Sequence, residues 1–182
     1  MSQSSKMNDA LKKYVVAPLK ALGFTGEFPH YRRVYDDRIE LFVIQKNTWG
    51  NSFTIEVSTI YPQREGPEKN YDDWKENIDD VNVWDTNLRY RLPGMIDGWF
   101  YYTDVYAKRI PFHGKDYIAV SEKKKPDFHP AKGYKQIQIA DETIYERICC
   151  EVNKQMKKAF SWWKKMSKKQ SDKFPFVDLF RN

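Results

Sequence analysis

An amphipathic pattern near the end of the chain, from Asp141 to Lys168, sets the strongest constraint on the fold. On a helical wheel its apolar residues fall within an arc of roughly 160°. These apolar positions are Ile144, Tyr145, Ile148, Cys149, Val152, Met156, Ala159, Phe160, Trp162, Trp163 and Met166. The opposite side carries Lys154, Lys157, Lys158, Lys164, Lys165 and Lys168. Asp141 is the expected N-cap. A stripe of this length must lie against another apolar surface, and the dry face of a β-sheet is the available one.

Earlier in the chain, from His30 onward, the hydrophobic period changes from that of a helix to that of strands. Asp36 and Asp37 mark one hairpin turn, and the residues of 47–51 tolerate the backbone angles of a second turn. We expect strands at 30–35, 38–46, 53–58, 87–92, 99–107 and 115–120.

Alternation within two of these strands predicts which side chains face the core. We expect the inward residues to be Ile39, Leu41, Val43, Phe53, Ile55 and Val57. We expect Thr54, Glu56 and Ser58 to face solvent, because an antiparallel sheet commonly has one face packed on the core and the other exposed to solvent.

A first helix is predicted from Asn8, as its N-cap, to about Leu22, with Gly23 ending it and Pro18 kinking it. The chain therefore predicts an α+β fold. In it, an antiparallel β-sheet carries this N-terminal helix and the long amphipathic C-terminal helix packed on one face. A length of 182 residues fits a single domain, 1–182.

Two segments differ in composition from the predicted helices and strands. Residues 62–86 carry eight acidic and three basic side chains with two prolines, and we expect an acidic loop with a short helix near Asp72 to Ile78. Residues 121–136 are rich in lysine and contain two prolines, which predicts a solvated loop.

Four stretches resemble the bacterial domain-of-unknown-function family 4304 (DUF4304). They are PLKALGF at 18–24, VIQKNTWGNSFTIEV at 43–57, LRYRLPGMIDGWF at 88–100 and FSWWKKMSKKQSD at 160–172, before FPFVDLF. The chain departs from the family pattern at Glu56, where a small amide or other polar residue is usual, and in the longer acidic segment. The resemblance implies an α+β domain and supplies no catalytic residue.

The residue pattern gives no catalytic residue, metal site or cofactor site. The three histidines, His30, His113 and His129, do not have the spacing of zinc ligands. Cys149 and Cys150 are adjacent on a helix, so their thiols point about 100° apart and cannot easily form a bridge. An enzyme that uses His113 with an acid is the third functional hypothesis.

The first hypothesis is a non-catalytic protein-binding domain, and in its more specific form an immunity-type inhibitor of a bacterial toxin. The expected partner is another protein that contacts the acidic segment 62–86, with Trp74 and Trp84 as apolar anchors inside an acidic patch. The candidate contact residues within that segment are Asp72, Asp73, Trp74, Asp79, Asp80 and Trp84. Trp49, at a predicted hairpin tip, is either a further anchor or folds back over the sheet edge.

The second hypothesis is nucleic-acid binding. A net charge of +6 permits it, and the lysines of the C-terminal helix could follow a phosphate backbone. A lysine-rich face is also the ordinary solvated side of a helix. No apolar run approaches the roughly 20 residues of a membrane span, and the N-terminus lacks a signal peptide's apolar stretch. We therefore expect a cytoplasmic protein without membrane contact, and the oligomeric state stays open.

Overall fold

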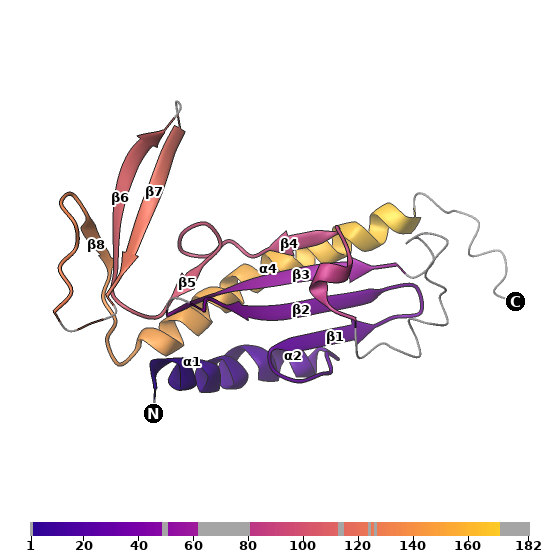
Figure 1. Ribbon diagram of the computed structural model, residues 1–182. Coiled ribbons are helices and arrows are strands. Elements are labelled where there is room, and N and C mark those ends of the chain that lie inside the picture. Colours follow the sequence, from indigo (N-terminus) through magenta and orange to yellow (C-terminus); the bar gives the residue numbers. More distant parts are fainter. Residues whose placement is uncertain are drawn as a thin grey trace, which may run out of the picture.

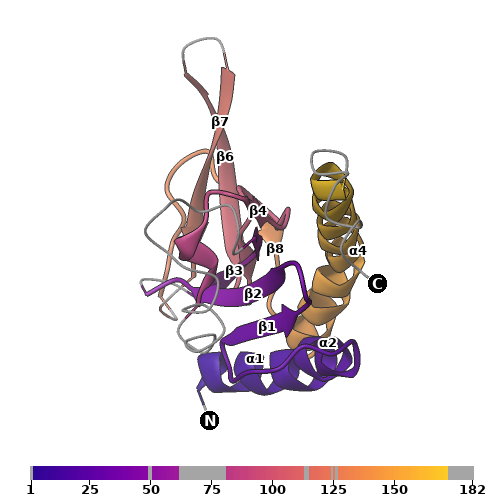
Figure 2. The same ribbon diagram turned by 90° about the vertical axis from the view of Figure 1, so that its right-hand side faces the viewer.

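The computed structural model describes residues 2–48, 51–61, 81–112, 115–123, 125 and 127–171. Helices and antiparallel sheets share this part of the chain, so the predicted α+β fold is confirmed (Figure 1). The N-terminal helices and the long C-terminal helix pack beside each other on one face of a larger sheet, as predicted, and a smaller sheet stands away from this body (Figure 2).

The N-terminal helix begins six residues earlier than the sequence pattern predicts, with Ser2 in place of Asn8 as its N-cap. Its parts are α1 (Gln3–Leu11), a π-helical turn η1 (Lys12–Val16) and α2 (Ala17–Ala21). The prediction of Asn8 as N-cap is wrong, because Ser2 Oγ accepts a hydrogen bond from Ser5 N at 3.2 Å and starts the helix there.

Pro18 lies inside this helix without ending it. The turn before it is widened, and the N–H of Ala17 donates to the carbonyl oxygen of Lys12, five residues earlier. Such a π-bulge makes room where a proline ring would clash with the preceding turn. Gly23 adopts a φ of 89° directly after the helix, which confirms the predicted end.

The larger sheet is antiparallel and has the strand order β1-β2-β3-β4, with β5 also pairing with β3. Its strands are β1 (His30–Val34), β2 (Ile39–Lys46), β3 (Ser52–Ile60), β4 (Arg89–Arg91) and β5 (Phe100–Tyr101). In the register of β2 with β3, Phe42 is opposite Val57 and Ile44 is opposite Ile55. The two predicted hairpins, at 30–46 and 38–58, are thus present, and β3 extends beyond the prediction to Ile60.

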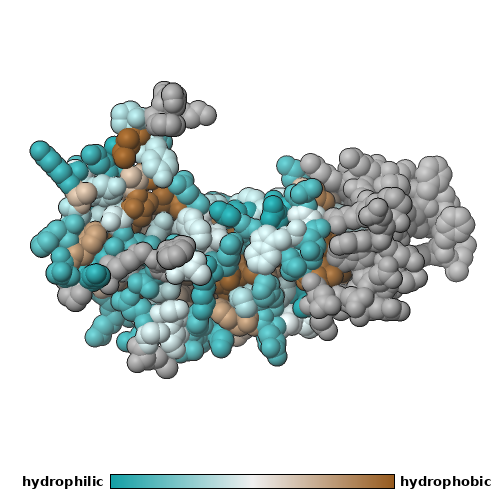
Figure 3. All heavy atoms as spheres, in the orientation of Figure 1, coloured by the Kyte–Doolittle hydropathy of each residue, from teal (hydrophilic) through white to brown (hydrophobic). Residues whose placement is uncertain are grey.

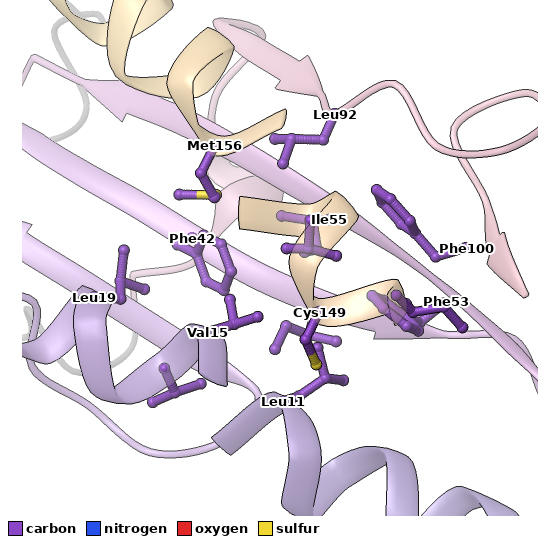
Figure 4. Packing of buried hydrophobic residues seen from close by; sticks show 14 of the residues in the cluster. Leu11, Val15, Leu19, Phe42, Phe53, Ile55, Leu92, Phe100, Cys149 and Met156 are labelled. Carbon is purple, nitrogen blue, oxygen red and sulfur yellow. The ribbon is translucent and has the colours of Figure 1, made fainter. Parts of the chain in front are cut away.

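One prediction about the sheet faces is wrong. Ile39, Leu41 and Val43 do not face the main core; they form a second buried cluster with Ile60, Val81 and Val83. The main core uses the alternate residues of β2, and Figure 4 shows Phe42 lying with side chains from the N-terminal helix, α4 (Ile144–Ser171) and β3.

The prediction that one face of β3 is exposed to solvent is also wrong, because the second buried cluster covers that side of the sheet. Every residue from Ser52 to Ile60 is buried, including Thr54, Glu56 and Ser58. Both faces of this central strand are covered, so its polar side chains lie in the interior.

Helix α4 packs along the main core as its apolar stripe predicts. The residues of the stripe that are buried are Ile144, Ile148, Cys149, Val152, Met156, Ala159 and Trp163, and Tyr145, Phe160 and Trp162 are partly buried against them. Asp141 Oδ1 accepts hydrogen bonds from Thr143 N at 2.9 Å and from Thr143 Oγ1 at 2.7 Å just before the helix. Each fully buried large apolar side chain contributes roughly 1.5–3 kcal/mol.

The smaller sheet has three strands in the order β7-β6-β8. They are β6 (Val105–Phe112), β7 (Lys115–Glu122) and β8 (Lys135–Gln138). The predicted strand at 99–107 is divided between β5 and β6, since residues 102–104 leave the strand conformation as the chain passes from one sheet to the other. The expected loop at 121–136 is shorter, because β7 and β8 extend into both of its ends.

Most of the predicted acidic segment 62–86 lies outside the described residues, including the expected helix at Asp72 to Ile78. Its described end forms a 3₁₀ turn, η2 (Val83–Asp85). Asn82 caps this turn by accepting from Trp84 N at 2.9 Å. No helix in the described part of the chain has both the length and the apolar content needed to cross a membrane.

Candidate protein-interaction surface

Among the residues predicted to contact a protein, Trp84 is the one that the structure describes. Its side chain is 47% exposed, and its ring meets that of His30 edge-on with 5.9 Å between centroids. Burial, with a smaller contribution from the positive charge of Arg32, lowers the pKa of His30. The remaining contact predictions fall outside the described residues: Trp49, Asp72, Asp73, Trp74, Asp79 and Asp80.

The predicted nucleic-acid face follows the outer side of α4. All six of its lysines are exposed: Lys154, Lys157, Lys158, Lys164, Lys165 and Lys168. The buried stripe of the same helix faces the core, so the lysines point away from it. Lys154 Nζ lies 3.5 Å from Glu151 Oε2, an exposed pair of little energetic weight. The fold thus gathers these lysines into one row of positive charge.

Two buried carboxylates are held by structural ion pairs. Glu40 accepts from Arg33 Nε at 3.1 Å and from Arg38 Nε at 3.2 Å. Glu56 accepts from Arg91 Nε at 2.9 Å. These pairs link β1 to β2 and β3 to β4, so both carboxylates have a role in strand pairing.

The histidines and cysteines do not assemble into a reactive site within the described part of the chain. No three His, Cys, Asp or Glu side chains there lie close enough to share a metal ion. His129 is exposed in the segment before β8, and His113 is outside the described residues. Burial raises the pKa of the Cys149 thiol to about 12, with a smaller contribution from the charge of Glu146. Cys150 is exposed.

The sequence reasoning missed a groove on the smaller sheet. A hollow of about 530 Å³ lies along one face of β6 and β7, and it is lined by Ile96, Ala107, Ile118 and Ile137 with three basic residues. Figure 3 shows hydrophobic residues gathered on this projecting part of the molecule. Ile118 is 36% exposed and Ile137 45% exposed, so the groove is open to solvent. Exposed apolar patches of this kind commonly mark interaction sites.

The base of the same sheet is anchored in the body of the protein. Val105 is buried with Ile96 and Tyr101, and Gln138 Nε2 donates to the carbonyl oxygens of Tyr101 and Thr103, each at 2.7 Å. The sheet is therefore held firmly where it leaves the body, while its outer part presents apolar side chains to solvent.

One signal in the sequence could have indicated part of this groove. Residues 136–139 read Gln-Ile-Gln-Ile, the alternation of a half-buried strand, at the end of the lysine-rich segment. The remaining walls come from Ile96 and Ile118, which only the fold brings near Ile137.

Comparison with known proteins gives one match. A family model described as a domain of unknown function (DUF4304) matches residues 15–166. No curated protein and no solved structure matches the chain.

Proposed function

This chain belongs to the DUF4304 family of domains of unknown function, and we propose that it is a non-catalytic, cytoplasmic protein-binding domain. The observation that carries the proposal is the projecting sheet, whose exposed isoleucines line an open groove. An apolar surface that stays in contact with water is unfavourable for a monomer, and a partner that covers it gains the hydrophobic free energy of its burial.

In its more specific form, the proposal is an immunity-type inhibitor that neutralises a toxin by covering part of its surface. Its support is an analogy with small domains that accompany toxins, together with a surface whose recognition depends on shape and charge. An inhibitor of this kind needs a rigid projecting element and no chemistry of its own. The anchored base and open outer part of the smaller sheet support this form of the proposal.

Affinity capture from the source cells tests the protein-binding proposal. The immobilised chain should retain a partner in stoichiometric amount, and Ile118→Asp/Ile137→Asp should lose at least 90% of it, because hot-spot contacts dominate such interfaces. Leu22→Asp is the matched control, since Leu22 is an exposed apolar residue on the C-cap of α2. If the double variant retains as much partner as the control, the projecting sheet is not the contact surface.

Activity of the captured partner tests the immunity form. A toxin partner should lose its activity when one equivalent of this chain is added, and should keep it when the double variant is added. A captured partner that has no toxic activity removes the immunity form while protein binding stands.

Nucleic-acid binding is the second candidate, and the exposed lysine row on α4 favours it. A phosphate-tracking face should bind a labelled 20-nucleotide strand with an affinity that falls steeply with salt. Lys157→Glu/Lys158→Glu should weaken that binding strongly. Lys6→Glu on α1 is the control, because it changes the net charge at a distance from the lysine row, and it should weaken the binding much less. Affinity that does not change with salt would exclude this candidate.

A further inference from the structure

The register of the smaller sheet defines which side chains share the groove face. Arg109 lies opposite Ile118, and Ala107 lies opposite both Val120 on β7 and Lys135 on β8. Residues directly opposite each other in an antiparallel pair point to the same face. The groove face therefore carries Ile118 and Val120 together with Arg109, Lys135 and Asp116. Lys108, opposite Ala119, alternates to the other face of β6 and meets the groove at its border.

Basic residues border the apolar floor of this groove. Lys108, Arg109 and Lys135 line it together with the isoleucines. Lys108 Nζ donates to the carbonyl oxygen of Lys132 at 3.4 Å, which keeps this ammonium group near the groove. Arg109 Nη1 lies 3.3 Å from Asp116 Oδ2, and both of these side chains are largely exposed, so this ion pair is weak and a stronger acidic ligand can replace it.

The charge of the whole sheet has the same sign as that of the groove border. Strands β6, β7 and β8 contain four basic and two acidic residues. A positive surface of this kind attracts an acidic partner during approach and disfavours a basic one. The apolar floor then supplies the contact area that is lost from water on binding.

We propose that this groove binds an extended acidic segment of a partner protein. An aliphatic or aromatic side chain of that segment lies against Ile118 and Ile137, and its carboxylates pair with Lys108, Arg109 and Lys135. The inference rests on the proposed protein-binding function and names the chemistry of its partner.

Two other occupants fit the groove less well. A second copy of the chain in a two-fold arrangement would place one basic border against the other, which is unfavourable. Helix α4 ends away from the smaller sheet (Figure 1), and residues 172–182 come after it in the sequence. The 28 residues of α4 extend about 42 Å. Residues 172–182 reach at most about 40 Å when fully extended. This segment is therefore too short to run back along the whole of α4 to the groove.

A displayed library of random 12-residue peptides tests the proposal on the full chain. Peptides that bind the wild-type protein are counter-selected against Ile118→Asp/Ile137→Asp, so that only groove-dependent sequences are enriched. These should carry a net negative charge and at least one large apolar side chain. The best of them is then made with a fluorescent label. Its Kd should be at least 10-fold higher for Lys108→Glu/Lys135→Glu than for the wild type, and should be unchanged for Leu22→Asp.

A milder variant guards against loss of folding. Lys108→Ala/Lys135→Ala should melt at the wild-type temperature and still bind the labelled peptide at least about 3-fold more weakly, since each charge pair contributes modestly at an exposed border. Raising the salt concentration should reduce the affinity of the wild type more than that of this variant.

Three results would overturn the inference. Enriched peptides that are neutral or basic contradict the partner chemistry. Failure to enrich any groove-dependent peptide contradicts docking in the groove. A concentration-dependent dimer, seen in sedimentation and lost in Ile118→Asp/Ile137→Asp, assigns the groove to self-association. The capture experiment separates these from failure of the proposed function, because a partner retained equally by wild type and groove variant leaves protein binding intact at another surface.

Discussion

The indole Nε1 of Trp163 donates a hydrogen bond to the backbone carbonyl oxygen of Ser58 across 2.9 Å of buried interior. The same indole ring lies against Phe24, with 5.4 Å between ring centroids, and against Phe160 at 5.6 Å. One side chain of α4 thus contacts the central strand β3 and the segment that follows α2. It fixes the position of the helix along the sheet as well as its distance from it.

Trp163→Phe should lower the free energy of unfolding by about 2–4 kcal/mol, because the Ser58 carbonyl loses its partner and the smaller ring leaves a cavity. Trp162→Phe is the matched control: Trp162 is only partly buried and stacks on Tyr90 with 6.0 Å between centroids. Its cost should stay below about 1 kcal/mol. Urea unfolding followed by circular dichroism measures both, and equal midpoints for the two variants would contradict this account.

The pairing of Glu56 with Arg91 gives a second prediction. Arg91→Met leaves a carboxylate buried without its partner, and it should cost roughly 1–3 kcal/mol after allowance for the half-exposed arginine. Adding Glu56→Gln should restore part of this loss, because the uncompensated charge is then removed. Arg109→Met breaks an exposed pair and should cost less than about 0.5 kcal/mol. Thermal melts of the wild type, Arg91→Met, Glu56→Gln and the double variant measure the coupling, and strictly additive effects would show that the buried pair is not linked.

The C-terminal helix could be predicted in detail because its signal is local. Lysines and apolar residues alternate along it with a period that no strand shares, so its buried stripe follows from sequence alone. Its partner surface could not be predicted in the same way. In β2, four consecutive apolar residues, Leu41 to Ile44, give no period of two, and the choice of face depends on what covers the sheet.

The groove shows a different limit of sequence reasoning. Ile96, Ile118 and Ile137 come from three separate segments, and each alone reads as an ordinary strand or loop residue. The burial of Glu56 likewise depends on Arg91, 35 positions away, and on cover over the second face of β3. Such pairings follow from tertiary contacts that local pattern does not encode.

The adjacent cysteines should react at very different rates. Cys149 is buried with a pKa raised to about 12, whereas Cys150 is exposed. Because the thiolate is the reactive form, a thiol reagent at pH 8 should label Cys150 at least about 100-fold faster. Titration of the native chain should therefore show one fast thiol, and the denatured chain should show two. Cys150→Ser should abolish the fast phase, and a fast phase that persists in this variant would contradict the packing of α4.

Acid should destabilise the protein through His30. Burial lowers the pKa of His30 in the folded state below its ordinary value of 6.5. The unfolded chain therefore binds a proton more readily, and folding stability should fall as the pH drops below about 6.5. His30→Asn should flatten this part of the stability profile, while His129→Gln, at an exposed position, should follow the wild type. Parallel profiles for His30→Asn and wild type would exclude His30 as the source.

Alkali should destabilise the protein through Tyr101, at the base of the smaller sheet. Burial raises the pKa of Tyr101 from 10.0 to about 12, and the negative charges of Glu122 and Asp97 add to the effect. The folded state therefore holds this proton at a pH where the unfolded chain has released it. Stability should be intact below about pH 10 and should fall as the pH rises toward 12.

The variant Tyr101→Phe separates this titration from general alkaline unfolding. It should reduce the slope of unfolding free energy against pH between about 10 and 12. Tyr101 packs with Ile96 and Val105, so its ionisation acts where the projecting sheet joins the body. Hydrogen exchange should then show β6 amides losing protection at a lower pH in wild type than in Tyr101→Phe, and identical exchange in both would contradict this assignment.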